Sequence, residues 1–146
     1  MFGPHLTLDL YHCNKEKLND AELITKLLVD FPEFIGMHRI SEPQVTVYHG
    51  KPESFDRGGI SAFVLLAESH VSIHTFPSDE FASVDIFSCK EFDLDKAQDF
   101  LMKTFEAKKA EKNLIIRGKN FIKHYPRNIS KSHKIVQKER KKLLRY

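Results

Sequence analysis

Residues 65–77, LLAESHVSIHTFP, form the densest unusual segment of this chain. The apolar run of residues 62–67 leads into it and predicts a well-buried strand. Beyond Glu68 the pattern changes, because polar and apolar residues alternate. If this part is also a strand, His70 and His74 share one of its faces. The stretch therefore joins a core-forming segment to a run of chemically reactive side chains.

Working outward, further strands are predicted on both sides of this stretch. Residues 5–11 alternate strictly between apolar and polar and predict a half-buried strand. Strands are also predicted at residues 44–48, 82–89 and 114–116.

Two amphipathic helices are predicted between the strands. Asn19 and Glu22 have the spacing of a capping box and open the first helix. Its apolar positions continue to Phe31, and Pro32 helps to end it. Asp93 has the side chain of an N-cap and opens the second helix. The apolar stripe of that helix comprises Leu94, Ala97, Phe100, Leu101 and Phe105.

The predicted order of elements, β-α-β-β-β-α-β, indicates an α+β fold. We expect a two-layer sandwich, in which a mainly antiparallel sheet carries two helices on one face. The other face of the sheet is partly polar, so it is able to hold a functional site or a contact between two copies.

Length and composition indicate one small globular domain of 146 residues, 41% of them hydrophobic. No apolar stretch approaches the roughly 20 residues that span a bilayer. Residues 1–5 lack the basic and apolar regions of a secretory signal. We therefore expect a cytoplasmic protein with no membrane contact, in which Cys13 and Cys89 are free thiols.

The net charge of +3 conceals an uneven distribution. Residues 118–146 hold ten Lys or Arg against one acid, Glu139, so they carry +9 and residues 1–117 carry −6. We predict a domain of residues 1–118 and a basic C-terminal extension of residues 119–146. A solvated extension is expected, and the alternative is non-specific, salt-sensitive binding of nucleic acid through its phosphates.

The residues alone leave several kinds of chemistry open. Ser, His and Cys near residue 70 are possible nucleophiles and bases, although such histidines and cysteines more often only pack in a core or on a surface. His70, His74 and Cys89 do not have the spacing of a zinc site, so no metal is predicted. The Gly-x-Ser-x-Gly elbow of many serine hydrolases is absent around Ser69.

Residues 65–77 are very similar to the processing site of the prokaryotic S-adenosylmethionine decarboxylases. This family, which depends on a pyruvoyl group, has Leu-Ala-Glu-Ser-His-(aliphatic)-Ser-Ile-His-Thr-(aromatic)-Pro at that site. The resemblance includes residues 3–6 and 9–11, Gly59-Ile60-Ser61, and the strand that ends at Cys89. It covers roughly residues 3–118 and implies the fold of this family.

The resemblance implies that the chain is a proenzyme that cleaves itself between Glu68 and Ser69. The Ser69 hydroxyl attacks the preceding carbonyl across a strained peptide, which a fold can hold in place. The resulting ester undergoes β-elimination, and hydrolysis of the dehydroalanine leaves a pyruvoyl group. The products are a β chain of residues 1–68 and an α chain from residue 69 onwards.

The resemblance also assigns roles to individual residues. His74 corresponds to the histidine that removes the Ser69 α-proton, and Ser61 to a serine that assists processing. Cys89 corresponds to the cysteine that donates a proton during decarboxylation. The pyruvoyl carbonyl forms a Schiff base with the substrate amine and takes up electrons, so no separate cofactor or metal is implied.

The substrate-binding residues depart from the family pattern. The family has a glutamate that binds the ribose hydroxyls where this chain has Ser78, and Asp79 or Glu80 are possible replacements. Phe55 corresponds to an aromatic residue that stacks on adenine, and its alternative role is core packing. Phe55 and Phe76 are the expected substrate-binding residues, and the proline that the family has between Phe55 and Ser61 is missing.

Three functions follow from this comparison. The first is S-adenosylmethionine decarboxylation, which releases CO2 and supplies the aminopropyl donor for spermidine. The second is decarboxylation of another amino acid, such as arginine or ornithine, on the same scaffold. The third is binding of a ligand or partner by a non-catalytic relative. The resemblance further implies a homodimer or a pair of dimers with active sites near the interface.

Overall fold

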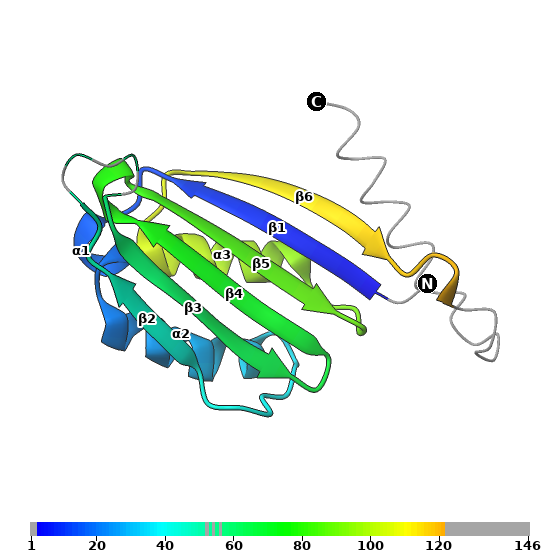
Figure 1. The fold of residues 1–146 in the computed structure, drawn as a ribbon. Coiled ribbons are helices and arrows are strands. Elements are labelled where there is room, and N and C mark those ends of the chain that lie inside the picture. The colour runs from blue at the N-terminus through cyan, green and yellow to red at the C-terminus, as the bar shows by residue number, and fades with distance from the viewer. Residues whose placement is uncertain (1–2, 52, 54, 56, 122–146) are drawn as a thin grey trace.

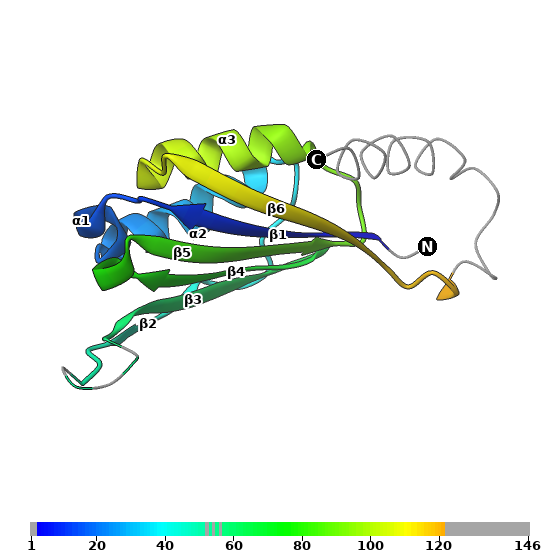
Figure 2. The same ribbon diagram turned by 90° about the horizontal axis from the view of Figure 1, so that it is seen from above.

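A single antiparallel sheet forms one layer of the molecule, and helices form the other (Figures 1 and 2). The computed structural model describes residues 3–51, 53, 55 and 57–121. The strands are β1 (Gly3–Tyr11), β2 (Gln44–Tyr48), β3 (Gly59–Leu66), β4 (Ser69–Phe76), β5 (Phe81–Ser88) and β6 (Lys109–Arg117). The helices are α1 (Lys15–Leu18), α2 (Ala21–Phe34) and α3 (Leu94–Phe105), with a 3-10 turn, η1 (Pro77–Asp79). The strand order is β2-β3-β4-β5-β1-β6, and the predicted α+β fold is confirmed.

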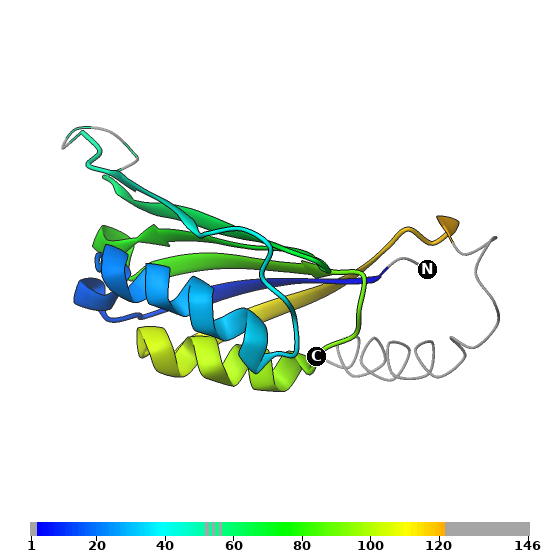
Figure 3. The ribbon, with the colours of Figure 1, turned by 90° about the horizontal axis from the view of Figure 1, so that it is seen from below.

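The hydrophobic core lies between the sheet and the two long helices, α2 and α3, which run side by side on one face (Figure 3). Alternate residues of each central strand point into it, as in the fully buried Leu6, Leu8 and Leu10 of β1. Phe31 of α2 and Phe105 of α3 are also fully buried. Burial of each such side chain stabilises the fold by about 1.5–3 kcal/mol.

The strand predicted at residues 62–67 is present as part of β3, but the prediction that it is well buried was wrong. β3 alternates, so that Ala62 and Val64 face the helices while the side chains of Phe63 and Leu65 are each 44% exposed on the opposite face. The helices among the described residues cover one side of the sheet, and an unbroken apolar run therefore leaves half of its side chains on the other side.

The predicted order contained five strands, whereas the residues that the structure describes form six. Residues 59–66 and 69–76 form two antiparallel strands joined by a tight turn, with Leu66 paired to Ser69. The last strand is also longer than the predicted residues 114–116, because residues 109–117 pair with all of β1. The first half of this strand, residues 109–113, is mostly polar, so its sequence alone does not mark it as a strand.

The helix caps were predicted with mixed success. Asp93 caps α3 by accepting a hydrogen bond from the Lys96 N–H at 3.0 Å, as predicted. The first long helix, α2, is capped by Asp20, one residue after the predicted Asn19, which instead ends α1. Pro32 lies inside α2, which continues to Phe34.

The sheet face opposite the helices, here called the open face, presents rows of polar side chains. Hydrogen-bonded neighbours across it include Ser83 and Asp9, whose side chains are 3.0 Å apart. Exposed apolar side chains, Phe63, Leu65 and Ile115, lie at the borders of these polar rows. The open face thus resembles a surface made for contact with other molecules more than an ordinary solvated sheet.

Candidate active site

The turn between β3 and β4 holds the Glu68–Ser69 peptide bond. Glu68 is only 8% exposed, although it carries a carboxylate. Ser69 has a backbone φ of +143°, which a residue with a side chain rarely adopts. Such a conformation costs about 1–3 kcal/mol and persists only where the surrounding structure imposes it. The backbone is therefore strained at the bond that the sequence singled out.

The carbonyl oxygen of Glu68 accepts a hydrogen bond from the backbone N–H of Cys89, with a nitrogen-to-oxygen distance of 2.8 Å. Cys89 directly follows β5, whose last residue, Ser88, pairs with Ser69. The thiol of Cys89 is exposed. Glu68, Ser69 and Cys89 therefore meet at one end of the sheet, and we call these three residues the cleavage cluster.

Gly3 lets the first strand approach the cleavage cluster closely. A Cβ atom on Gly3 would lie 1.9 Å from the Ser88 carbonyl oxygen and 2.7 Å from the Cys89 Cα. Both neighbours are backbone atoms and cannot rotate away. A side chain at this position would therefore displace the segment that bonds the Glu68 carbonyl.

The Glu68 side chain is bound by His38, a residue that the sequence analysis did not select. The His38 backbone N–H donates to Oε2 of Glu68 at 2.9 Å, and its Nδ1 lies 2.8 Å from Oε1. Burial by itself raises the pKa of the Glu68 carboxyl, but the hydrogen bonds from His38 outweigh it and leave that pKa below its ordinary value. The Glu68 side chain is thus held as a carboxylate.

A second group of predicted residues lies further along the same strands. The Ser61 hydroxyl and the His74 Nδ1 are 2.9 Å apart, on neighbouring residues of β3 and β4. Both side chains are on the open face and are exposed. We call them the serine–histidine pair.

The cleavage cluster and the serine–histidine pair do not meet within one chain. Ser69 and His74 are five residues apart on one extended strand, which corresponds to about 17 Å. Figure 1 shows the β3–β4 turn at one end of the sheet, with η1 and the start of β3 at the other. The structure therefore separates residues that the sequence places close together.

The predicted substrate-binding aromatics lie at the end of the sheet that holds the serine–histidine pair. Phe55, in the connection between β2 and β3, is fully exposed, which contradicts its alternative role in core packing. Phe76, the last residue of β4, is half-buried, and its ring centroid lies 5.6 Å from that of Phe81. An exposed aromatic face is suited to stacking on a flat ligand.

The residues after Phe76 differ in their availability to a ligand. Glu80 has its carboxylate 3.5 Å from Lys15 and 4.0 Å from His12. Asp79 is exposed, and its side chain has no hydrogen bond or ion pair with any other described residue. Of the two acids next to Ser78, Asp79 is therefore the one whose carboxylate is free to meet a ligand.

His70 directly follows Ser69 and lies in an aromatic cluster on the open face. Its ring is 5.8 Å from that of Phe87 and 6.4 Å from that of His5. Burial, together with the proximity of His5, lowers the pKa of His70. His5 in turn binds Asp85 at 3.0 Å. This cluster borders the cleavage site but does not belong to it.

The profile of the protein family described as S-adenosylmethionine decarboxylase matches residues 4–118, which include both groups of residues. This chain belongs to the S-adenosylmethionine decarboxylase family. The family resemblance inferred from residues 65–77 is therefore confirmed.

Individual relatives agree with this family. A protein named S-adenosylmethionine decarboxylase proenzyme from Thermodesulfovibrio yellowstonii is 33% identical over 138 residues, which cover 94% of this chain and 93% of that protein. One of the same name from Clostridium botulinum (strain Loch Maree) is 34% identical over 80% of this chain and 95% of its own length. The crystal structure of the adenosylmethionine decarboxylase from Aquifex aeolicus VF5 matches with a TM-score of 0.63 and 32% identity, covering 80% of this chain and 91% of that chain.

The basic extension of this family member lies mainly beyond residue 121 and outside the described structure. The alignment with the Thermodesulfovibrio protein spans 138 of the 146 residues, so it necessarily continues past residue 118. The similarity to that relative therefore includes part of the extension, which the family profile does not reach.

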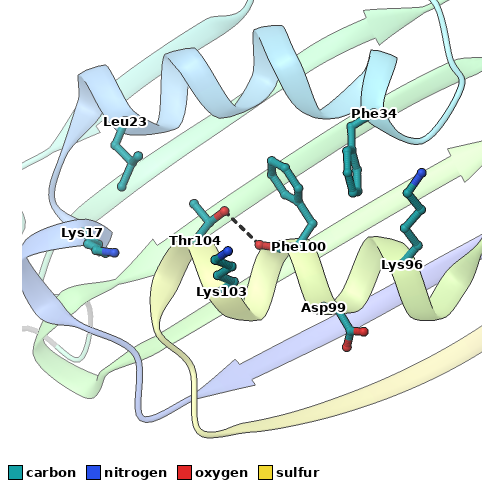
Figure 4. Close-up of a pocket in the computed structure, with 8 residues that line it drawn as sticks. All are labelled: Lys17, Leu23, Phe34, Lys96, Asp99, Phe100, Lys103 and Thr104. Carbon is teal, nitrogen blue, oxygen red and sulfur yellow. Dashed lines mark hydrogen bonds between the residues drawn. The ribbon is translucent and has the colours of Figure 1, made fainter.

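A groove of about 660 Å³ lies between α2 and α3, on the side of the sheet away from the open face (Figure 4). It is lined by Lys17, Leu23, Phe34, Lys96, Asp99, Phe100, Lys103 and Thr104. None of the predicted site residues contributes to it. The predicted Ser61 and His74 instead lie on the open face, and Glu68, Ser69 and Cys89 lie at or beside the β3–β4 turn.

Among residues 3–51, 53, 55 and 57–121, no three His, Cys, Asp or Glu side chains are grouped so that they could hold a metal ion. Within the same residues, no helix has the length and apolar character needed to cross a membrane.

Proposed function

We propose that this chain is an S-adenosylmethionine decarboxylase that first cleaves itself between Glu68 and Ser69. One observation carries the proposal: the strained Ser69 backbone lies beside a Glu68 carbonyl that already accepts the Cys89 N–H at 2.8 Å. This arrangement occurs at the place where the sequence matches the family's processing motif. The main interpretation of the sequence is also favoured over the arginine, ornithine and non-catalytic alternatives by the name that the relatives share.

The first step of the proposed cleavage is an acyl shift from nitrogen to oxygen. The Ser69 hydroxyl oxygen bonds to the Glu68 carbonyl carbon, and the carbonyl oxygen becomes an oxyanion. The Cys89 N–H is already directed at that oxygen and stabilises the charge as it forms. The proton of the hydroxyl passes to the Ser69 nitrogen, and the bond between the Glu68 carbon and that nitrogen breaks. This leaves an ester and a free amine on Ser69, and it relieves the backbone strain at Ser69.

The second step is a β-elimination that needs a base for the Ser69 α-proton. Removal of this proton breaks the bond between Cβ and Oγ, and Glu68 leaves with a free α-carboxylate. Water then replaces the nitrogen of the dehydroalanine, which yields ammonia and the pyruvoyl group at residue 69. His74, hydrogen-bonded to Ser61, has the chemistry of this base.

His74 cannot perform this step within its own chain, because about 17 Å of extended strand separates it from Ser69. We infer that two copies stack their open faces in opposite strand directions about a two-fold axis. The serine–histidine pair of each copy then lies over the cleavage cluster of the other. The exposed Phe63, Leu65 and Ile115 on the open face support such a contact.

The cleavage cluster has the groups that a pyruvoyl enzyme requires at this position. Ser69 is the precursor, and the exposed Cys89 thiol beside it is available to donate a proton to the substrate carbon. The pyruvoyl group, once formed, supplies a carbonyl that takes up the electrons released as CO2 leaves. The family's chemistry therefore fits the residues at this end of the sheet without a metal.

The substrate we propose for this site is S-adenosylmethionine. Phe55 and Phe76 provide aromatic faces for the adenine, and Asp79 replaces the missing family glutamate as acceptor for the ribose hydroxyls. These residues lie at the same end of the sheet as the serine–histidine pair. A substrate that they bind is therefore placed next to the pyruvoyl group of the partner copy.

The test is to incubate the purified protein with S-adenosylmethionine, arginine and ornithine, each labelled in the carboxyl group, and to measure the labelled CO2. We expect release from S-adenosylmethionine alone, and none from the Ser69→Ala variant, which cannot form a pyruvoyl group. Release from arginine or ornithine but not from S-adenosylmethionine would contradict the proposed substrate while leaving the self-cleavage intact.

A further inference from the structure

His38 forms hydrogen bonds with both residues that precede the Glu68–Ser69 bond. Its backbone N–H and its Nδ1 bind the two carboxylate oxygens of Glu68 separately, at 2.9 and 2.8 Å. Its carbonyl accepts the N–H of Ala67 at 2.8 Å. The two residues before the scissile bond are thus both fixed by one residue from another part of the chain.

The segment that carries His38 is itself anchored along the end of β3. The Ile40 N–H donates to the Leu65 carbonyl at 3.0 Å, and Arg39 bridges to Leu66. Lys90, which follows Cys89, donates to the Gly36 carbonyl at 2.8 Å. The segment therefore binds both parts of the chain that meet at the cleavage cluster.

The side chains of His38 and Glu68 differ in exposure, and this difference indicates which of the two is stabilised more by their contact. The Glu68 side chain is 11% exposed, whereas the His38 side chain is 75% exposed. A surface histidine gains little from such a pair, but a buried carboxylate without its donors is costly. The contact therefore stabilises mainly the buried Glu68 carboxylate.

We propose that His38 is a positioning residue for self-cleavage, which fixes the Glu68 side chain so that the Glu68 carbonyl stays between the Cys89 N–H and the Ser69 hydroxyl. This inference rests on the proposed self-cleavage. With its carboxylate bound at one end and its carbonyl oxygen bound at the other, Glu68 keeps little freedom to rotate. Orientation of this kind raises the rate of an intramolecular attack.

The same contact assists the elimination. When Glu68 leaves, it gains a second negative charge on its α-carboxylate, close to the side-chain carboxylate. Two hydrogen bonds from His38 offset the charge already present on the side chain. After cleavage, the carbonyl of His38 still holds Ala67, so the new end of the β chain remains docked.

The test compares variants of the full chain made by cell-free synthesis, with intact masses recorded over time after synthesis is stopped. His38→Ala and His38→Phe remove the side-chain donor, and His38→Phe keeps a ring of similar size. Loss of a hydrogen bond to a charged group corresponds to cleavage slower by about ten- to a hundredfold. His38→Asn keeps an N–H near the position of Nδ1 and is expected to cleave at close to the wild-type rate.

Arg39→Ala is the matched control. The Arg39 side chain binds the Ser41 carbonyl at 3.2 Å and the Glu42 carboxylate at 2.9 Å, so its removal perturbs the same segment without touching Glu68. We expect Arg39→Ala to cleave at the wild-type rate. Melting temperatures measured in the Ser69→Ala background, which cannot cleave, identify any variant that fails to fold.

The step affected is found in a His74→Ala background, where the ester accumulates and hydroxylamine splits it. Addition of His38→Ala is expected to slow the appearance of the hydroxylamine-sensitive form. If the wild type cleaves, and His38→Ala and His38→Phe both cleave as fast as the wild type, the role of His38 is refuted. Equal slowing by Arg39→Ala would refute it too, whereas an uncleaved wild type would refute the self-cleavage itself.

Discussion

At the scale of single residues, the two cysteines are chemically opposite. Burial, reinforced by the Glu80 carboxylate, raises the pKa of Cys13 to about 11, so its thiol stays protonated through the neutral range. Cys89 is exposed directly after β5, and its backbone N–H donates to the Glu68 carbonyl. A proton donor to a substrate carbon must be accessible, and only Cys89 of the two meets that condition.

This contrast predicts selective labelling by iodoacetamide. At pH 8, Cys89 is expected to be alkylated at least about tenfold faster than Cys13, because a raised pKa and burial both withhold the thiolate of Cys13. Peptide mass spectrometry over time measures both rates, and CO2 release is expected to fall in step with Cys89 alkylation. Comparable labelling of Cys13 in the folded protein would contradict the account.

A second prediction at this scale concerns Asp79, the acid that we propose replaces the family glutamate. Asp79→Asn is expected to raise KM for S-adenosylmethionine by about tenfold or more, because a hydrogen bond from a hydroxyl to a charged acceptor is lost. Glu80→Gln is the control, since the Glu80 carboxylate is engaged with Lys15 and His12. Steady-state kinetics of the two variants decide the matter, and a larger effect from Glu80→Gln would reverse the assignment.

At the scale of elements, the cleavage cluster depends on how closely β1, β4 and β5 approach each other. Gly3 is the position where this approach is tightest. Gly3→Ala is expected to slow self-cleavage by about tenfold or more, because the added Cβ meets the Ser88 carbonyl and shifts the Cys89 N–H away from the Glu68 carbonyl. The measurement is the intact mass over time, with folding checked by the melting temperature in the Ser69→Ala background. Cleavage of Gly3→Ala at the wild-type rate would show that the position of the Cys89 N–H does not depend on a glycine at residue 3.

The elements also show how far sequence patterns reach. The strand at residues 44–48 and the Asp93 cap were predicted correctly, because alternation and an N-cap side chain are local signals. The burial of residues 62–67 was predicted wrongly, because exposure of Phe63 and Leu65 depends on which sheet face the helices cover. The full length of β6 was missed for a similar reason, since its pairing with β1 and not its composition makes it a strand.

At the scale of the whole molecule, the site divides into two parts at opposite ends of the open face. The sequence motif contains both Ser69 and His74, which are only five residues apart. Because these residues lie on one extended strand, their separation is about 17 Å, and the motif by itself does not show this distance. His38 could not be found from the motif either, because its contact with Glu68 joins residues 30 positions apart. The chemistry could be predicted only from the family resemblance of the motif, because the residue types alone leave several kinds of chemistry open. The proposal that the site is divided between two copies required the fold.

A mixing experiment tests this division. Ser69→Ala and His74→Ala each remove one part, and neither protein is expected to cleave normally when it is expressed alone. In a mixed dimer, the intact Ser69 of one chain faces the intact His74 of the other. Co-expression of the two variants, one tagged, is therefore expected to restore cleavage of the His74→Ala chain, as seen by mass. If that chain remains uncleaved in purified mixed dimers, the site is not shared between copies.

The most direct test of the central claim is the intact mass of the purified wild-type protein. Self-cleavage predicts two chains divided after Glu68, with the second chain beginning at a pyruvoyl group in place of Ser69. The Ser69→Ala variant, measured beside it, is expected to remain one chain. A wild-type protein that stays a single 17.0 kDa chain after prolonged incubation would contradict the account.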